Sequence, residues 1–452
     1  MLHDVHPQRI LARQEIIMQN LWVFADPVFG PTPFTGKVLE LINTAELTRL
    51  RDIKQLSTAS LFYPAANHSR FQHSLGMAKL VKDFVINVLD EKPHIISLLV
   101  YASLVHDIGH AAWGHAGELN MEYRGISLEH SDLSSRLIGG DPELTKYFEG
   151  YGLPLVSQVL SEEDRILVSK LVLGKPPVLP KLKSDKEIAL EEKNMRYLGQ
   201  IIASRALDFD RLEYLIRDAF YTTTAASFFR LKDVFESLIV STVGDAKELI
   251  FGNRDFAESF VITRELMYSG VYQQPRDLVA TEMLARGFNI CFLQSVDPYK
   301  MWFRTDEELL QDMYLNDKSK QIAALIKSRQ IYTILYQNVF SALPTPTVRK
   351  FGELTKPETL KLEEDIAKPE LEPWQVLICI RIAKEPKEAD AWVMTPTGRP
   401  ELLRRISPIV AAMTQDYRDS RSRVVLAVHP QTSDTDKNAV LKRFKAYFEI
   451  AG

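Results

Sequence analysis

Three histidines and an aspartate stand within eleven residues of otherwise apolar sequence, VHDIGHAAWGH, which begins at Val105. His106 and His110 are four residues apart, so on a helix their imidazoles would share one face, with Asp107 beside them. Imidazole nitrogens and carboxylate oxygens together suit a borderline divalent cation. A lone His-Asp pair is more often a helix cap or a buried polar pair, so a metal site here needs further ligands from elsewhere.

Two other stretches contain suitable ligands. Upstream, the sequence NHSRFQHSLG opens an apolar-periodic run from Leu75 to Leu89, which predicts an amphipathic helix with His73 in its first turn. Downstream, the sequence LDFDRLEYLIRD places acidic residues on a second helical pattern. One of these residues, Asp210, could return to the histidines in space.

These residues resemble the H…HD…D ligand signature of the HD-domain metal-dependent phosphohydrolases, and the surrounding sequence is more specific than the ligands. It closely resembles the deoxynucleoside triphosphate triphosphohydrolase branch, which includes the sterile-alpha-motif and HD-domain enzyme of vertebrates. The resemblance extends over about residues 23 to 286. The segments that carry it are RLRDIKQLSTASLFYPAANHSRFQHSLG (49–76), LVHDIGHAAWGH (104–115) and DFDRLEYLIRD (208–218).

The resemblance implies metal-dependent hydrolysis of deoxynucleoside triphosphates to deoxynucleosides and inorganic triphosphate. His110 and His130 become candidates for proton transfer, because the leaving oxygen must be protonated. The implied ligands of one divalent ion per site (Mn, Mg, Fe, Ni, Co or Zn) are His73, His106, Asp107 and Asp210. The implied substrate contacts are Gln55 and Asp218 at the sugar, and Arg70, His115, Arg211, Tyr214 and Arg276 at the phosphates.

Some positions depart from the family or allow a structural role. Phe29 stands where relatives usually carry a histidine. Relatives often have glutamate after His130, but this chain has Ser131, so a neighbouring acid such as Glu129 or Asp132 would have to orient that imidazole. The predicted phosphate-binding arginines could instead pair with acids and hold helices together.

Composition favours one large helical domain with a smaller appendage. The chain has 452 residues, of which 46% are hydrophobic, enough for a sizeable core. The net charge of −4 gives no global attraction to nucleic acid or to anionic membranes. Two cysteines in distant apolar segments favour a reducing compartment, and no apolar run reaches membrane-spanning length. We therefore expect a cytoplasmic protein without a membrane partner, for which nucleic acid is an unlikely ligand.

The fold class that we predict is mainly α, with an HD-domain helical core and a smaller C-terminal α+β unit. Prolines near residue 345 mark the boundary, which gives domains over residues 1–345 and 346–452, the second with assembly as a candidate role. A proline-rich, then charged, segment predicts an exposed excursion over about residues 174–196. Helices are expected up to residue 339, including 7–20, 197–218, 228–243, 255–286 and 319–339. Strands are expected at 376–382 and 424–428, with helices at 400–413 and 434–448.

The resemblance also implies a homo-oligomer, most readily a tetramer, with a nucleotide effector at an interface as a further expectation. Of three positions that recognise an activating guanine nucleotide in the vertebrate enzyme, here 43, 48 and 51, only Arg51 keeps its type. Two alternatives remain open. One is an HD phosphohydrolase for another nucleotide or phosphate ester, although the Gly-Tyr-Pro and Glu-Asp signatures of two such subgroups are absent. The other is a nucleotide sensor with little turnover.

Overall fold

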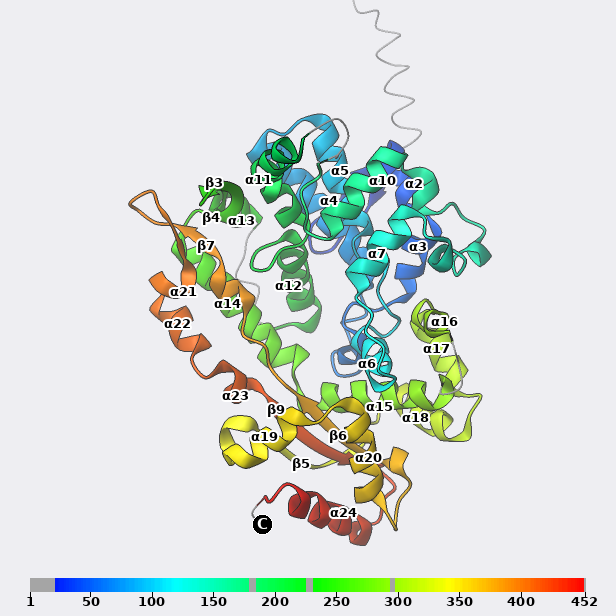
Figure 1. Cartoon of the computed structure of the whole chain (residues 1–452). Helices are drawn as coiled ribbons and strands as arrows, with labels where there is room; N and C mark the ends of the chain where they lie inside the picture. Colours follow the sequence, from blue (N-terminus) through cyan, green and yellow to red (C-terminus); the bar gives the residue numbers. More distant parts are fainter. Residues whose placement is uncertain (1–20, 179–183, 225–230, 293–296, 451–452) are drawn as a thin grey trace, which may run out of the picture.

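Helices make up most of the chain, in agreement with the predicted mainly α fold class. The computed structural model describes residues 21–178, 184–224, 231–292 and 297–450 (Figure 1). The helix expected over residues 7–20 lies outside the described residues. No helix of the described part is long and apolar enough to cross a membrane.

The helical core occupies the upper part of Figure 1 and is built around α4, which packs against α5 and α12. Apolar residues recur on the inward side of α4, from Phe71 to Phe84, and are buried. This packing brings together three segments that lie far apart in the sequence. The helices of the first half are α2 (Gly36–Ile42), α3 (Ala45–Arg49), α4 (Arg70–Phe84), α5 (Pro93–Val105), α6 (His115–Tyr123), α7 (His130–Gly139), α8 (Pro142–Thr145), α9 (Val156–Val159), α10 (Glu162–Val172), α11 (Asp185–Ile202) and α12 (Phe209–Thr222).

Two sheets follow the helical core, and both join strands that are distant in sequence. A four-stranded sheet has the order β3-β4-β7-β8, and a three-stranded antiparallel sheet has the order β5-β9-β6. A short hairpin of β1 (Trp22–Phe24) and β2 (Thr32–Phe34) precedes them. The strands are β3 (Leu238–Val243), β4 (Ala246–Phe251), β5 (Thr333–Val339), β6 (Val376–Arg381), β7 (Trp392–Met394), β8 (Pro400–Leu402) and β9 (Arg423–Val428).

The helices of the second half surround these sheets. α15 lies between the core and the three-stranded sheet in the lower part of Figure 1, whereas α20 and α24 pack on the sheet's far side. They are α13 (Leu231–Ser237), α14 (Arg254–Met267), α15 (Pro275–Phe292), α16 (Pro298–Trp302), α17 (Asp306–Met313), α18 (Asp317–Lys327), α19 (Thr345–Glu353), α20 (Lys356–Ala367), α21 (Leu403–Ile406), α22 (Pro408–Thr414), α23 (Tyr417–Arg421) and α24 (Asp434–Tyr447).

Three of the expected helices are partly strands, and these predictions were wrong. The helix expected over 400–413 begins as β8 and continues as the two short helices α21 and α22. The helix expected over 228–243 ends at Ser237 in the described part, and residues 238–243 form β3, which pairs with β4 across the two-residue turn Gly244-Asp245. Residues 228–230 lie outside the described residues. The helix expected over 319–339 ends at Lys327, and residues 333–339 form β5. The segments of β3 and β5 are rich in β-branched residues, which favour strands, and a Gly-Asp turn is a hairpin signal.

The predicted excursion at residues 174–196 is exposed but is not a loop in its second half. Ser184 begins α11 with a capping box to Glu187, and the helix continues to Ile202. Its outer half is charged and exposed, whereas Leu198, Ile201 and Ile202 are buried. The helix expected over 197–218 is therefore two helices, because the chain turns at Ser204, whose N–H binds the Asp208 carboxylate (2.9 Å).

The three-stranded sheet packs on the helical core with one face and on α24 with the other. Leu377, Cys379 and Val425 belong to the large core cluster that includes the buried residues of α4, α5 and α12. Val376 and Val424 instead belong to a second cluster with residues of α24. The strands predicted at 376–382 and 424–428 and the helix predicted at 434–448 are present as β6, β9 and α24. Since β5 starts before the prolines near residue 345, a domain division there stays a proposal.

Candidate active site

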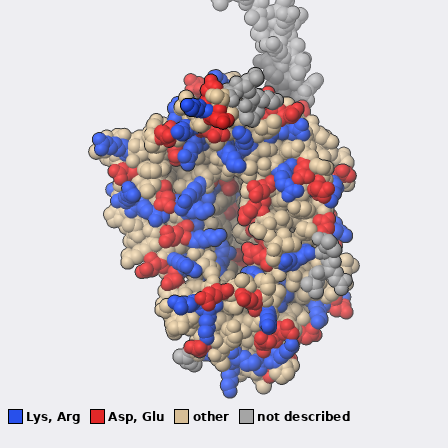
Figure 2. Space-filling model, in the orientation of Figure 1, with Lys and Arg blue, Asp and Glu red and all other residues tan. Residues whose placement is uncertain are grey.

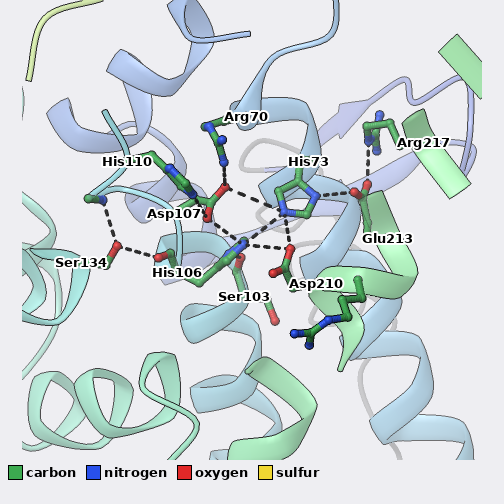
Figure 3. Close-up of polar contacts among 12 residues, drawn as sticks. Arg70, His73, Ser103, His106, Asp107, His110, Ser134, Asp210, Glu213 and Arg217 are labelled. Atoms are coloured by element: carbon green, nitrogen blue, oxygen red, sulfur yellow. Dashed lines mark hydrogen bonds and ion pairs between the residues drawn. The ribbon is translucent and has the colours of Figure 1, made fainter. Parts of the chain in front are cut away.

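The four predicted metal ligands converge (Figure 3). The Nε2 atom of His73 lies 3.2 Å from Nε2 of His106 and 3.1 Å from Oδ1 of Asp210. The Nε2 atom of His106 lies 3.3 Å from Oδ1 of Asp107 and 3.8 Å from Oδ1 of Asp210. His73, His106 and Asp107 are buried, and one ligand atom from each lies within 4.8 Å of the others. Two imidazole nitrogens and two carboxylates thus face one point.

The outer nitrogens of both imidazoles are occupied, which points Nε2 inward. Nδ1 of His106 binds the carbonyl oxygen of Ser103 (2.8 Å), and Nδ1 of His73 binds the carboxylate of Glu213. Glu213 in turn binds Nε of Arg217 (2.6 Å), as Figure 3 shows. Hydrogen bonds of this kind fix the tautomer that leaves Nε2 free to bind a metal. The donor set and its support therefore fit a divalent cation.

The approach of Glu213 to His73 depends on Gly76, one turn along α4. A Cβ atom at Gly76 would lie 2.1 Å from Oε1 of Glu213, so a side chain there would displace the Glu213 carboxylate. Beyond Glu213, Arg217 reaches Asp26 (2.7 Å) and lies over the ring of Phe29 (5.3 Å to the centroid). Phe29 thus packs against Arg217, which supports His73 through Glu213.

The His-Asp segment is a turn, not the helix face that its spacing predicted. α5 ends at Val105, and the chain turns through residues 106–109. Gly109 passes so close to α7 that a Cβ there would lie 2.3 Å from the carbonyl oxygen of His130. The hydroxyl of Ser134 fixes this crossing, since it accepts from the Gly109 N–H (2.9 Å) and donates to the His106 carbonyl (2.6 Å).

Asp107 is held as a carboxylate by its neighbours. Burial acts to raise its pKa, but the imidazoles of His106 and His110 and the guanidinium of Arg70 hold the pKa of Asp107 well below its ordinary value. Arg70 donates from Nη1 to Oδ2 of Asp107 (2.7 Å). Arg70 therefore lies beside the metal ligands, and its Nε is buried without a hydrogen-bond partner.

A cavity of about 260 Å³ opens beside the metal ligands. Figure 2 shows a furrow down the middle of one face of the molecule, where acidic and basic residues intermingle. Most of the predicted substrate and proton-transfer residues line the cavity, namely Gln55, Arg70, His110, His115, His130, Tyr214 and Asp218. Residues that the sequence analysis did not single out also line it, among them Tyr268, Tyr272, Asp277 and Arg381.

His110 and His130 form a stacked pair whose ring centroids are 3.8 Å apart. The carboxylate of Glu118 lies within ion-pair distance of both rings. Its Oε1 is 3.6 Å from Nδ1 of His130 and 3.8 Å from Nδ1 of His110. Its Oε2 binds Nδ1 of the exposed His115 (2.8 Å). Glu118 thus takes the place that the sequence analysis considered for Glu129 or Asp132. The spacing of His115 and Glu118, three residues apart on one helix, was the available signal.

The structure does not bring two of the predicted arginines to the cavity wall. Arg211 is paired with Asp208 and with Oε1 of Glu388 (2.9 Å). Arg276 is exposed and is not among the lining residues. A phosphate contact by either residue has no support from the geometry, whereas the predicted contact at Asp218 lies on the cavity wall.

Two hydrogen bonds hold Asp218 in the cavity wall. Nε2 of His68 lies 2.7 Å from Oδ1, and the hydroxyl of Tyr272 donates to Oδ2 (2.6 Å). The ring of His68 stacks on Tyr221 at 4.4 Å between centroids. The carboxylate of Asp218 is therefore fixed in position at the cavity wall and could accept a hydrogen bond from a hydroxyl group of a ligand.

Sequence comparison identifies both parts of the chain. Residues 70–206 match the HD domain, and residues 237–451 match the HD-associated region. The chain belongs to the HD-domain family. The HD match includes His73, His106 and Asp107, and the associated region includes all strands of the two larger sheets.

Curated relatives extend this result. An uncharacterised protein of Mycoplasma genitalium is 29% identical over 275 residues, which is 58% of this chain and 58% of that protein. The deoxynucleoside triphosphate triphosphohydrolase SAMHD1 homolog of Dictyostelium discoideum is 23% identical over 365 residues, 76% of this chain and 64% of that protein. SAMHD1 of Gallus gallus is 25% identical over 390 residues, 78% and 61% respectively. The chain spans less than two thirds of the length of these relatives.

The fold is also found in a solved structure. A hypothetical protein from Aquifex aeolicus superposes with a TM-score of 0.67 and 22% sequence identity, over 93% of this chain and 100% of that one. The HD helices and the C-terminal sheet therefore occur together in another protein.

Proposed function

We propose that this HD-domain protein hydrolyses deoxynucleoside triphosphates to deoxynucleosides and inorganic triphosphate. The observation that carries the proposal is the convergence of two histidines and two carboxylates on the wall of a cavity that also holds a stacked histidine pair and a fixed Asp218. The SAMHD1 relatives, whose name states this activity, support the substrate class.

In the proposed reaction, water attacks the α-phosphorus and the bond from that phosphorus to the 5′ oxygen breaks. The deoxynucleoside leaves with a proton on its 5′ oxygen, and the three phosphates leave together. A divalent cation held by His73, His106, Asp107 and Asp210 would act as a Lewis acid that withdraws charge from the phosphoryl group. The metal can be any of several divalent ions, because the mixed nitrogen and oxygen set has little preference.

Other side chains of the cavity would bind the phosphates, transfer the proton and bind the sugar. Arg70, beside Asp107, is placed to bind a phosphate oxygen and offset its negative charge. His110 and His130 would carry the proton to the leaving oxygen, and the Glu118 carboxylate lies 3.6 Å from Nδ1 of His130 and 3.8 Å from Nδ1 of His110. Gln55 and Asp218 present an amide and a carboxylate that suit sugar hydroxyl groups. The stacked rings and fixed carboxylates keep these groups in position before the substrate arrives.

Regulation and assembly belong to the same proposal. Arg51 stacks on Phe71 (3.8 Å to the centroid) and lines a separate cavity of about 470 Å³ that also contains Lys54, Lys327 and Arg329. Three acids, Asp52, Asp306 and Glu307, line the same cavity, and Lys327 is paired with Glu307 (3.1 Å). A nucleotide effector at this cavity therefore rests on the family resemblance. The proposed assembly is a homo-oligomer, as in the family that the sequence resembles, and cytoplasmic residence stays a proposal.

The test is turnover of purified protein with each deoxynucleoside triphosphate, singly and mixed, with Mn²⁺ or Mg²⁺. The control is the double variant His106→Ala, Asp107→Ala. Release of deoxynucleoside by the wild type and its loss in the double variant support the proposal. Release of a nucleoside mono- or diphosphate would instead indicate another HD phosphohydrolase activity. Tight nucleotide binding without any product would indicate a sensor.

A further inference from the structure

Arg381 is the last residue of β6 and lines the active-site cavity. It is half-buried, and it shares with His115 and Thr281 the wall of an adjoining groove of about 210 Å³. The three-stranded sheet therefore contributes a cation to a cavity whose proposed metal ligands all come from the helical core. The sequence analysis did not single out this arginine, because its β-branched strand has no motif.

Arg423 stands directly opposite Arg381 in the register of β6 and β9. Opposite residues of an antiparallel pair project to the same side of a sheet, and like charges in this arrangement are destabilising. That side is the one that packs on the helical core, because Cys379 and Val425, the next pair with the same orientation, lie in the large core cluster. Two guanidinium groups thus face the core together.

Neither guanidinium has an acidic partner among the residues that the structure describes. No carboxylate oxygen there lies within 4.0 Å of either one. Nε of Arg423 is buried without a hydrogen-bond partner. Burial, then Arg421 and Arg381, lower the pKa of Arg423. This pair carries positive charge that the described protein does not neutralise at short range.

Neighbouring arginines are neutralised. Arg70 is bound to Asp107, and Arg421 to Glu265 (2.8 Å). Arg264 lies 3.0 Å from Oε2 of Glu388, the same carboxylate that binds Arg211. Among these neighbouring arginines, Arg381 and Arg423 therefore differ in having no acidic side chain within ion-pair distance in the described part of the chain.

The carboxyl group of Asp277 also lines this part of the cavity, but it is engaged elsewhere. Its Oδ1 accepts a hydrogen bond from the hydroxyl of Thr58 (2.6 Å). It forms no ion pair within 4.0 Å with Arg381. Burial raises the pKa of Asp277 to about 6, and the charge of Arg381 acts to lower it, so the two groups interact only at longer range. The Arg381 guanidinium can therefore still bind an external anion.

We propose that Arg381, with Arg423 behind it, binds an outer phosphate group of the substrate's polyphosphate chain, so that the C-terminal sheet completes the active site. This inference rests on the proposed function. A guanidinium can bind a phosphate through two parallel N–H donors. Arg70 would hold the chain near the metal ligands, and Arg381 would hold it farther along.

The test is calorimetric titration of inorganic triphosphate, diphosphate and monophosphate into the Mn²⁺-loaded protein. Wild type is compared with Arg381→Gln, Arg381→Lys and the control Arg349→Gln, an exposed arginine of α19 outside the cavity. We expect Arg381→Gln to weaken triphosphate binding about tenfold or more, with a smaller effect for Arg381→Lys. Monophosphate binding and the control variant should be unchanged.

The same variants are assayed for turnover, which separates the two proposals. A raised KM for deoxynucleoside triphosphates in Arg381→Gln, with the wild-type melting temperature, supports the inference. Equal triphosphate affinity in wild type and Arg381→Gln overturns it, even if the wild type is active. An inactive wild type that binds triphosphate through Arg381 overturns only the proposed function. If Arg381→Gln does not fold, Arg381→Ala and Arg423→Gln replace it. A wild-type KM and a wild-type affinity for triphosphate in both of these variants would overturn the inference.

Discussion

Glu118 Oε1 lies 3.6 Å from Nδ1 of His130 and connects α6 to the first residue of α7. Burial acts to raise the pKa of Glu118, but the imidazoles of His115, His130 and His110 hold that pKa well below its ordinary value. Glu118 therefore stays a carboxylate at neutral pH. It does not line the cavity, so its proposed role is to position the histidine pair.

Substitution Glu118→Gln should lower kcat without releasing the metal. Because the amide keeps the size but loses the charge that holds the two rings, we expect a decrease of kcat of about 10- to 100-fold. KM and metal content should stay close to wild type, and Glu118→Asp should restore part of the rate. The matched control is Glu122→Gln, one turn farther along α6 and exposed. Equal rates in Glu118→Gln and wild type would exclude this positioning role.

Substitution Glu213→Gln should weaken metal binding. Glu213 binds Nδ1 of His73, and loss of such a partner typically lowers metal affinity about 10- to 100-fold. The measurement is metal content after dialysis against graded chelator concentrations. Asp26→Asn is the control, since it removes the charge of the outer partner of Arg217 and keeps an oxygen that can accept from the N–H groups of Val28 and Phe29. Full metal retention by Glu213→Gln at every chelator concentration would argue against His73 as a ligand.

Substitution Glu388→Gln should destabilise the protein. Its buried carboxylate is shared by Arg211 and Arg264, and removal would leave two poorly solvated guanidinium groups without it. The expected loss in free energy of unfolding is about 3 to 5 kcal/mol, measured by urea denaturation. Glu385→Gln is the control, because Glu385 is largely exposed and lies 3.8 Å from Arg404. Its effect should stay below about 1 kcal/mol.

Glu46 should make stability depend on pH. Burial raises the pKa of Glu46 to about 7, although hydrogen bonds from its own N–H and that of Val156 act against this. A carboxyl group with a raised folded-state pKa stabilises the fold below its unfolded pKa, and this contribution is lost as pH rises toward 7. Glu46→Gln should therefore be more stable than wild type at pH 8, by about 3 kcal/mol, with little difference at pH 4.5. Urea denaturation at both pH values measures the difference in free energy of unfolding between the variant and the wild type. The same difference at both pH values would contradict the raised pKa of Glu46.

Two of the predicted ligands, His73 and Asp210, lie on helices that the sequence predicted, whereas the segment of His106 and Asp107 is a turn and not the expected helix. His73 lies in the first turn of α4, capped by Ser69 and Gln72, as its apolar run predicted. Asp210 lies in the first turn of α12. The two residues meet because α12 packs on α4. The helical patterns alone did not predict this packing, and only the family resemblance implied it.

The sequence did not predict contacts that depend on distant packing. Arg381 reaches the cavity only because a strand of the C-terminal unit packs on α15. Arg211 is withdrawn from the cavity wall by Glu388, which lies 177 residues farther along the chain. The β-branched run of β3 directly continues a helical pattern, so periodicity alone predicted a helix there, although a Gly-Asp turn follows it.

The central claim is that the bond between the α-phosphorus and the 5′ oxygen is cleaved by attack of water on phosphorus. The most direct measurement is mass spectrometry of the products formed in water enriched in ¹⁸O, with Mn²⁺ present. We expect unlabelled deoxynucleoside and inorganic triphosphate that carries one ¹⁸O atom. Labelled deoxynucleoside, or nucleoside monophosphate with diphosphate as the products, would contradict it.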